Sequence, residues 1–88
     1  MVRVFLRHEV VDYASWRRQY DSFVAERRAM GVINDNVFRN VEDDHEVTVS
    51  HDFETLADAE RFVSPRRLRE AKTPSGGSTE PSVWFAEL

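Results

Sequence analysis

Apolar residues recur at every second position in two stretches of the sequence, and this period of two is the feature that most constrains the fold. The first stretch runs through Val2, Val4 and Leu6. The second stretch runs through Val47, Val49, His51 and Phe53. Because successive side chains of a strand point to opposite faces, the pattern predicts a strand over residues 2–9 and another around residues 47–53, each with one apolar face.

A helical pattern follows the first strand. Asp12 is a suitable N-cap, since its carboxylate accepts hydrogen bonds from the free N–H groups of a first helical turn. Gly31 is a suitable terminator, because glycine tolerates a positive φ. The sequence therefore predicts a helix over about residues 13–30. Its apolar stripe consists of residues at helical spacing, namely Tyr13, Trp16, Tyr20, Phe23, Val24 and Met30.

A second helix is expected over about residues 56–63. Thr55 followed by Asp58 resembles a capping box, with Asp in the place of the usual Glu. The apolar face of this helix would consist of Leu56, Ala59, Phe62 and Val63. The pair Ser64–Pro65 then predicts a stop and a new helical start that continues to about Ala71.

The remaining segments complete the order β-α-β-β-α-β. Residues 32–40 are expected to form a second strand, residues 42–44 a hairpin turn, residues 73–81 a loop and residues 82–88 a last strand. This order predicts a single ferredoxin-like α+β domain over residues 1–88, in which all four strands form one antiparallel sheet. The first and third strands are expected to be central, and both helices to cover one face.

The other face of this sheet should carry a mixture of apolar and small polar residues, including Phe5, Thr48 and Ser50. A domain of 88 residues buries a limited fraction of its surface. Such a face is too apolar for free exposure to water, and a second copy of the chain would cover it. The sequence therefore predicts a homodimer.

Composition and charge exclude several functions. The chain has no cysteine, so it has neither disulfides nor cysteine-ligated metal sites. The net charge is −4, and acidic and basic residues are interspersed, which argues against nucleic-acid binding. The sequence contains no signal-peptide core and no apolar span of about 20 residues. We therefore expect a cytoplasmic protein that does not bind membranes.

Several motifs resemble the dimeric α+β barrel superfamily, especially its antibiotic-biosynthesis-monooxygenase-like group and small cyclase-like proteins. The motifs are Arg7-His8-Glu9-Val10, Asp12-Tyr13-x-x-Trp16, and Phe62-x-Ser64-Pro65-x-x-Leu68-Arg69 before an aromatic last strand. The superfamily includes cofactor-free monooxygenases, polyketide cyclases, haem-degrading enzymes and stress-responsive proteins. The resemblance therefore implies the fold and the dimer more than one reaction.

His8 and His51 are the candidate catalytic residues. Each continues the apolar register of its strand, so each should face the helices and be largely buried. Histidine titrates near neutrality and is therefore suited to general acid–base catalysis; the alternative is a histidine at the rim of the core that is bonded to backbone or water. The two should lie about 13 Å apart toward opposite ends of the sheet, so no shared metal site is predicted. We take His8 as the better candidate.

Aromatic residues provide candidate pocket walls. Trp16, Tyr20 and Phe23 from the first helix, with Phe62 opposite, would line a pocket for a flat ligand, or they simply pack in the core. The resemblance implies that Asn36 polarises a substrate carbonyl; the alternative is an irregular strand or a bulge.

Three functional hypotheses follow. The first is a small cofactor-independent enzyme, monooxygenase- or cyclase-like, that acts on an aromatic or polyketide-like small molecule in a helix–sheet pocket. The second is a non-catalytic dimeric ligand-binding or stress-responsive module. The third is haem binding, for which His8 would have to face a wide cavity. Glycine occurs only at positions 31, 76 and 77, so no nucleotide-binding motif is present.

Overall fold

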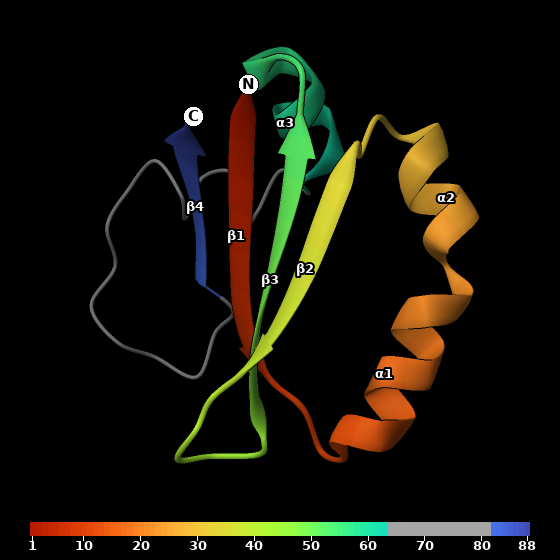
Figure 1. Cartoon of the computed structure of the whole chain (residues 1–88), viewed down its shortest axis with the longest axis vertical. Helices are drawn as coiled ribbons and strands as arrows, with labels where there is room; N and C mark the ends of the chain where they lie inside the picture. Colours follow the sequence, from red (N-terminus) through yellow and green to blue (C-terminus); the bar gives the residue numbers. More distant parts are fainter. Residues whose placement is uncertain (64–81) are drawn as a thin grey trace.

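A computed structural model describes residues 1–63 and 82–88, and its centre is one four-stranded antiparallel sheet (Figure 1). The strands are β1 (Val2–Glu9), β2 (Asn34–Arg39), β3 (Glu46–Phe53) and β4 (Ser82–Glu87). Their order across the sheet is β2-β3-β1-β4, so β1 and β3 are central. The ferredoxin-like topology predicted from the order of the elements is therefore confirmed.

The register of the strands places the apolar alternation on one face. Val4 pairs with His51 on β3 and with Phe85 on β4, and Leu6 pairs with Val49. Side chains on this face form the core of the described residues: Val2, Val4, Leu6, Val32, Val49, Phe53, Ala59, Val63 and Val83. The period of two in the sequence thus corresponds to the buried face of the sheet.

The helix predicted over residues 13–30 is divided into α1 (Tyr13–Ser22) and α2 (Val24–Ala29). The division is at Phe23, whose N–H donates to the Tyr20 carbonyl at 3.1 Å instead of to a carbonyl four residues earlier. The same carbonyl also accepts a 2.6 Å hydrogen bond from Nη1 of Arg27. Because the Arg27 side chain folds back onto this carbonyl, it stabilises the break that the sequence pattern did not indicate.

The predicted helix ends are confirmed. Asp12 caps α1 by accepting from the Ser15 N–H at 3.0 Å. Gly31 follows α2 with a φ of 101°. Thr55 caps α3 (Leu56–Phe62) by accepting a hydrogen bond from the backbone N–H of Asp58 at 3.2 Å. Asp12 and Thr55 accept hydrogen bonds from backbone N–H groups that a helix start leaves without a partner. Gly31 adopts the positive φ that is common just after a helix end.

Two details differ from the sequence predictions. The second strand begins at Asn34 and ends at Arg39, so it is shorter than the predicted 32–40. Leu56 is 49% exposed, and the apolar face of α3 therefore starts at Ala59, which is fully buried. The predicted restart at 64–65, the helix to about residue 71 and the loop 73–81 lie outside the described residues.

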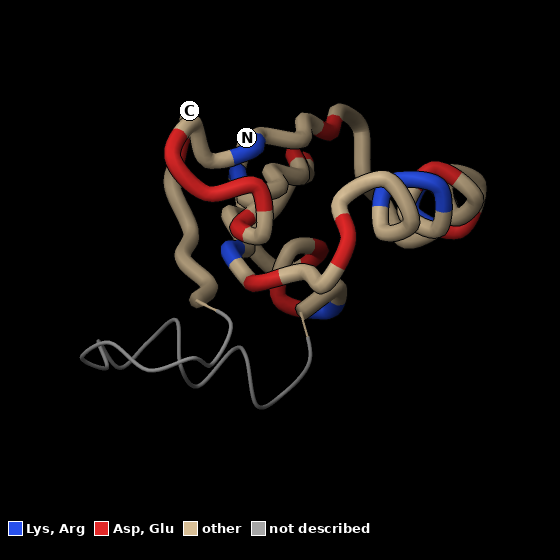
Figure 2. Tube along the Cα trace, turned by 90° about the horizontal axis from the view of Figure 1, so that it is seen from below, with Lys and Arg blue, Asp and Glu red and all other residues tan. Residues whose placement is uncertain are grey.

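Aromatic side chains of α1 and apolar side chains of α3 both pack against the apolar face of the sheet, as predicted. Figures 1 and 2 show α1 and α2 beyond the β2 side of the sheet, whereas α3 packs on β1 and β3. No residue of α1 is buried, although Trp16 and Tyr20 contact the core. The first helix therefore reaches the sheet through two aromatic side chains rather than through a closely packed face.

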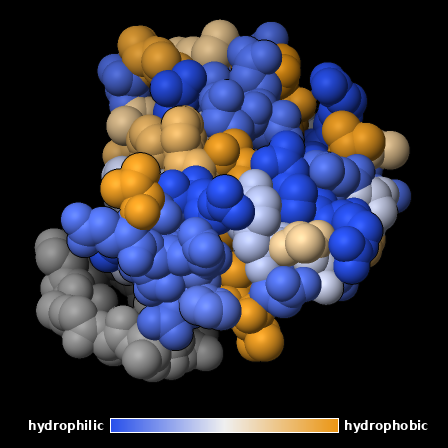
Figure 3. All heavy atoms as spheres, turned by 60° about the horizontal axis from the view of Figure 1, so that its bottom comes forward, coloured by the Kyte–Doolittle hydropathy of each residue, from blue (hydrophilic) through white to orange (hydrophobic). Residues whose placement is uncertain are grey.

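Basic and acidic residues alternate along the part of the chain that the structure describes. Figure 2 shows them interspersed along this part of the chain. Figure 3 shows separate hydrophobic patches within a mostly hydrophilic surface. Among the residues that the structure describes, no helix is long and apolar enough to span a bilayer.

Candidate functional site

A cavity of about 290 Å³ lies between the first two helices, β3 and α3. It is lined by Trp16, Gln19, Tyr20, Phe23, Arg27, His51 and Phe62. The cavity exists because α1 contacts the sheet through large aromatic side chains, which keep the backbone of α1 away from the backbone of the sheet. Its walls are mainly aromatic, and its polar groups come from four of the seven lining residues.

The aromatic walls form a continuous row of ring contacts. The ring of Trp16 stacks on Tyr20 with centroids 5.0 Å apart, and Tyr20 stacks on His51 at 6.1 Å. The His51 ring meets Phe62 edge-on at 4.9 Å. These distances are typical of favourable aromatic pairs. The row brings together four of the residues that the sequence analysis proposed for a site, and Phe23 lines the same cavity.

His51 is the buried titratable group of this cavity. It is 3% exposed, and its Nε2 lies 2.8 Å from the Tyr20 hydroxyl. Its Nδ1 is also buried and has no hydrogen-bond partner among the described residues. Burial, together with the positive charge of Arg27, lowers the pKa of His51 to about 4. His51 is therefore a neutral imidazole at pH 7.

The Tyr20 hydroxyl connects His51 to a partly buried ion pair. It donates to Oδ2 of Asp35 at 3.1 Å, and the same oxygen lies 3.3 Å from Nε of Arg27. The Arg27 guanidinium also lies over the Tyr20 ring, with Cζ 3.7 Å from the centroid. Burial raises the pKa of Tyr20, so the phenol keeps its proton at pH 7.

Strand register explains how Asp35 reaches this site. Asp35 pairs directly with His51 across β2 and β3, so the two side chains share one face. The neighbouring Asn36 consequently lies on the opposite face, where its Nδ2 donates to Oγ of Ser50 at 3.4 Å. The prediction that Asn36 contacts a substrate in the helix–sheet pocket is therefore wrong, because alternation along the strand places Asp35 there instead.

His8 is not among the residues that line this cavity. It pairs with Val47 on β3, four residues along that strand from His51, and its ring meets Trp16 edge-on at 5.7 Å. It is half-buried. The two histidines thus share a face but occupy different positions along it. Among the described residues, no group of three or more His, Cys, Asp or Glu side chains is arranged to bind a metal ion.

The sequence analysis missed three residues of the site: Gln19, Arg27 and Asp35. Arg27 lies seven residues after Tyr20, which is two helical turns, so helical spacing was a usable signal. Asp35 has the same parity along β2 as Val37, which packs against the core. A charged residue on the core face of a strand normally has a buried partner, and that rule would have indicated Asp35.

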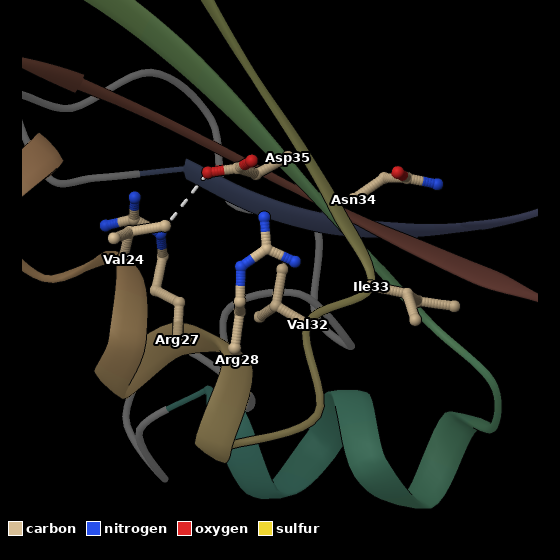
Figure 4. Close-up of a pocket in the computed structure, with 7 residues that line it drawn as sticks. All are labelled: Val24, Arg27, Arg28, Val32, Ile33, Asn34 and Asp35. Atoms are coloured by element: carbon tan, nitrogen blue, oxygen red, sulfur yellow. Dashed lines mark ion pairs between the residues drawn. The ribbon is translucent and has the colours of Figure 1, made fainter.

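Two other hollows are less suited to a ligand. The one in Figure 4, which has the Arg27–Asp35 ion pair at its side, has a volume of about 10 Å³, enough for roughly one water molecule. Another, of about 200 Å³, lies between the start of α3 and β4. It is lined by Val2, Leu56, Phe85, Ala86 and Glu87. Neither contains a histidine, so the cavity at His51 is the candidate site.

Similarity to known proteins is confined to structure. No protein-family model matches the sequence, and no curated protein matches it either. The solved structures with a similar fold include a protein described as an antibiotic biosynthesis monooxygenase. It has a TM-score of 0.66 and 11% sequence identity, and the match covers 100% of this chain and 98% of that one.

Two further solved structures have a similar fold. A protein described as a putative antibiotic biosynthesis monooxygenase from Deinococcus radiodurans has a TM-score of 0.60 at 14% identity, over 100% of this chain and 92% of that one. The protein PA3566 from Pseudomonas aeruginosa has a TM-score of 0.61 at 15% identity, over 97% and 90% of the two chains. At such identities the likeness is one of fold alone, and this chain shares its α+β fold with these three structures.

Proposed function

We propose that the chain is a small cofactor-independent enzyme that acts on an aromatic hydroxyl compound bound in the cavity at His51. The observation that carries this proposal is the neutral, buried imidazole of His51 in a cavity with aromatic walls. The proposal moves the catalytic role from His8 to His51, since His51 lines the cavity and His8 does not. The description of two structural neighbours as monooxygenases supports the reaction class.

The size and walls of the cavity favour a small flat ligand. Ligand pockets usually have volumes of about 300–1,000 Å³, and this one is at the lower limit. Trp16, Tyr20 and Phe62 provide surfaces on which an aromatic ring stacks favourably. The ligand is therefore expected to have one or two fused aromatic rings.

The chemistry begins with proton transfer. His51 accepts the proton of the ligand hydroxyl, and the resulting phenolate is stabilised by the positive charges of the imidazolium and Arg27. The phenolate in turn raises the pKa of His51 within the complex, because an opposite charge favours the charged form. The electron-rich ring then reacts with molecular oxygen: one oxygen atom enters the product quinone, and the other leaves as water with the two hydrogens that the substrate loses.

One observation favours the alternative of a non-catalytic ligand-binding module. In the free protein the pKa of His51 is about 4, and a base this weak is far from the value near 7 that suits general base catalysis at neutral pH. In this alternative the cavity binds an aromatic molecule, and His51 only accepts a hydrogen bond from it.

Oxygen uptake distinguishes the enzyme from the non-catalytic binding module. The purified protein is mixed with 1-naphthol in air-saturated buffer that contains a metal chelator, and oxygen consumption is followed together with the absorbance of the naphthoquinone. The enzyme proposal predicts one oxygen consumed per quinone formed, at a rate proportional to protein concentration. Saturable binding of 1-naphthol without oxygen uptake would support the binding module instead.

A further inference from the structure

We propose that Asp35 is a positioning residue, which acts through the Tyr20 hydroxyl to hold His51 in the tautomer with its proton on Nε2 and a bare Nδ1. This inference is based on two hydrogen-bond contacts that share the Tyr20 hydroxyl, one with His51 and one with Asp35. The role of the bare Nδ1 as the proton acceptor rests on the proposed function, whereas the tautomer itself does not.

The number of protons available between His51, Tyr20 and Asp35 decides the direction of their hydrogen bonds. The Tyr20 hydroxyl lies within hydrogen-bond distance of Nε2 of His51, at 2.8 Å, and of Oδ2 of Asp35, at 3.1 Å. A phenol has a single proton to donate, and a carboxylate has none. If Tyr20 donated to His51, no proton would lie between its oxygen and that of Asp35. Two oxygen atoms with lone pairs would then face each other in a half-buried site.

The opposite direction satisfies all three groups. Tyr20 donates to the Asp35 carboxylate, which makes a charge-assisted hydrogen bond, and the oxygen of Tyr20 then accepts from Nε2–H of His51. A neutral imidazole carries one N–H, so a proton on Nε2 leaves Nδ1 as an acceptor. Nδ1 of His51 is buried and has no hydrogen-bond partner among the described residues. This agrees with a nitrogen that accepts a hydrogen bond from a ligand.

Arg27 keeps Asp35 in the role of acceptor. Its Nε lies 3.3 Å from the same Oδ2 atom, and its side chain is 10% exposed. The Tyr20 hydroxyl and the Arg27 guanidinium both face Oδ2 as donors, so this oxygen has the role of acceptor toward both. Nη1 of Arg27 is bonded to the Tyr20 carbonyl at 2.6 Å, which fixes the guanidinium against α1. The direction of the hydrogen bonds therefore starts from a guanidinium, which has donors and no acceptor.

Asp35→Leu is the variant that tests this inference. Tyr20 and Arg27 both contact Oδ2 of Asp35, and a leucine of similar size removes this acceptor. Tyr20 would then donate to Nε2 of His51, so the imidazole proton would move to Nδ1. Long-range ¹H–¹⁵N NMR correlation at neutral pH identifies which ring nitrogen carries the proton. The expected result is Nε2–H in the native protein and Nδ1–H in Asp35→Leu.

Asp52→Leu is the matched control. Asp52 is adjacent to His51 in sequence but lies on the other face of the sheet, where it is paired with Arg3 at 2.7 Å. Its loss should leave the His51 tautomer unchanged, although it removes a carboxylate next to His51 in the chain. An Nδ1–H tautomer in the native protein would overturn the inference whether or not the variants fold. So would an unchanged tautomer in a folded Asp35→Leu, or the same change in Asp52→Leu.

Discussion

The two candidate histidines continue equivalent registers on adjacent strands, yet their surroundings differ. His51 is 3% exposed and contacts the Tyr20 hydroxyl in the cavity, whereas His8 lies four positions away along the sheet and meets the edge of Trp16. The sequence pattern places both on the helix-facing side but does not show where α1 leaves space. Which histidine lines a cavity depends on the packing of Trp16 and Tyr20, and that is a tertiary property.

Substitution of each histidine by alanine separates their roles. His51→Ala is expected to lower the rate of naphthol-dependent oxygen uptake by about 10²-fold or more, the usual effect of losing a general acid–base group. His8→Ala is expected to have a smaller effect, because His8 does not line the cavity. Initial rates with both variants at equal concentration decide between them. Loss of activity in His8→Ala alone would restore the assignment made from the sequence.

Burial of neutral His51 should also make stability depend on pH. Its pKa is about 4 in the folded protein and 6.5 when unperturbed, so only the unfolded chain binds this proton between those values. The free energy of unfolding should therefore fall as the pH falls from 6.5 to about 4, by roughly 3 kcal/mol from this group.

Urea unfolding at a series of pH values measures this contribution, with His51→Gln as the control. The variant should lose the part of the pH dependence between 6.5 and 4. It should keep the part below about pH 4, where Asp12 and Asp52, whose pKa values are lowered by their hydrogen-bond partners, become protonated. An identical pH profile in His51→Gln would show that His51 titrates normally.

At the scale of elements, the first strand and the helix caps follow directly from the sequence. The period of two predicts β1 with its observed bounds, and Asp12, Gly31 and Thr55 lie at the predicted helix ends. The break at Phe23 does not follow, because it depends on a hydrogen bond between the Arg27 side chain and the Tyr20 carbonyl. Local propensity determines where helices begin and end, but not where a hydrogen bond from a side chain two turns away divides one.

The face of β2 on which Asp35 lies also could not be predicted from local sequence. Three consecutive polar residues at 34–36 gave no clear alternation, so the phase of β2 was uncertain from the sequence alone. The pairing of Val37 with Val49 determines that phase and directs Asp35 toward His51. A one-residue difference in phase exchanges the two faces of a strand, so the phase decides whether Asn36 or Asp35 faces the cavity.

Gly31 provides a test at the junction of α2 and β2. Its φ of 101° is a conformation that residues with a Cβ rarely adopt, while a Cβ added there would meet only ordinary contacts, the nearest being the Phe53 ring at 3.7 Å. Gly31→Ala should therefore lower the free energy of unfolding by about 1–2 kcal/mol through backbone strain. Gly31→Asn should cost less, because Asn tolerates positive φ better. Equal stability of Gly31→Ala and the native protein in urea unfolding would contradict the assigned conformation.

At the scale of the whole molecule, the helix-free face of the sheet remains a proposed dimer interface. Phe5 stacks on Trp84 with centroids 5.2 Å apart, and Trp84 and Phe38 are 39% and 52% exposed. A second copy of the chain would cover these apolar side chains. Sedimentation equilibrium at micromolar concentration should therefore give about twice the chain mass of 10.3 kDa.

Trp84→Asp should shift this equilibrium to the monomer, because it places a charge in the proposed interface. Val41→Asp is the control, since Val41 is 97% exposed in the β2–β3 connection and its substitution should leave the dimer intact. A native protein that sediments as a monomer would refute the proposed interface.

We propose that the protein binds its aromatic ligand in the cavity at His51, between the helices and the sheet. The two tryptophans lie on opposite faces of the sheet: Trp16 lines the cavity, and Trp84 stacks on Phe5 on the helix-free face. Titration with 1-naphthol, followed through the two indole N–H signals by NMR, tests the claim within one molecule. The account predicts a saturable shift of the Trp16 signal while the Trp84 signal stays unchanged. A shift of Trp84 alone, or of neither signal at saturating naphthol, would contradict it.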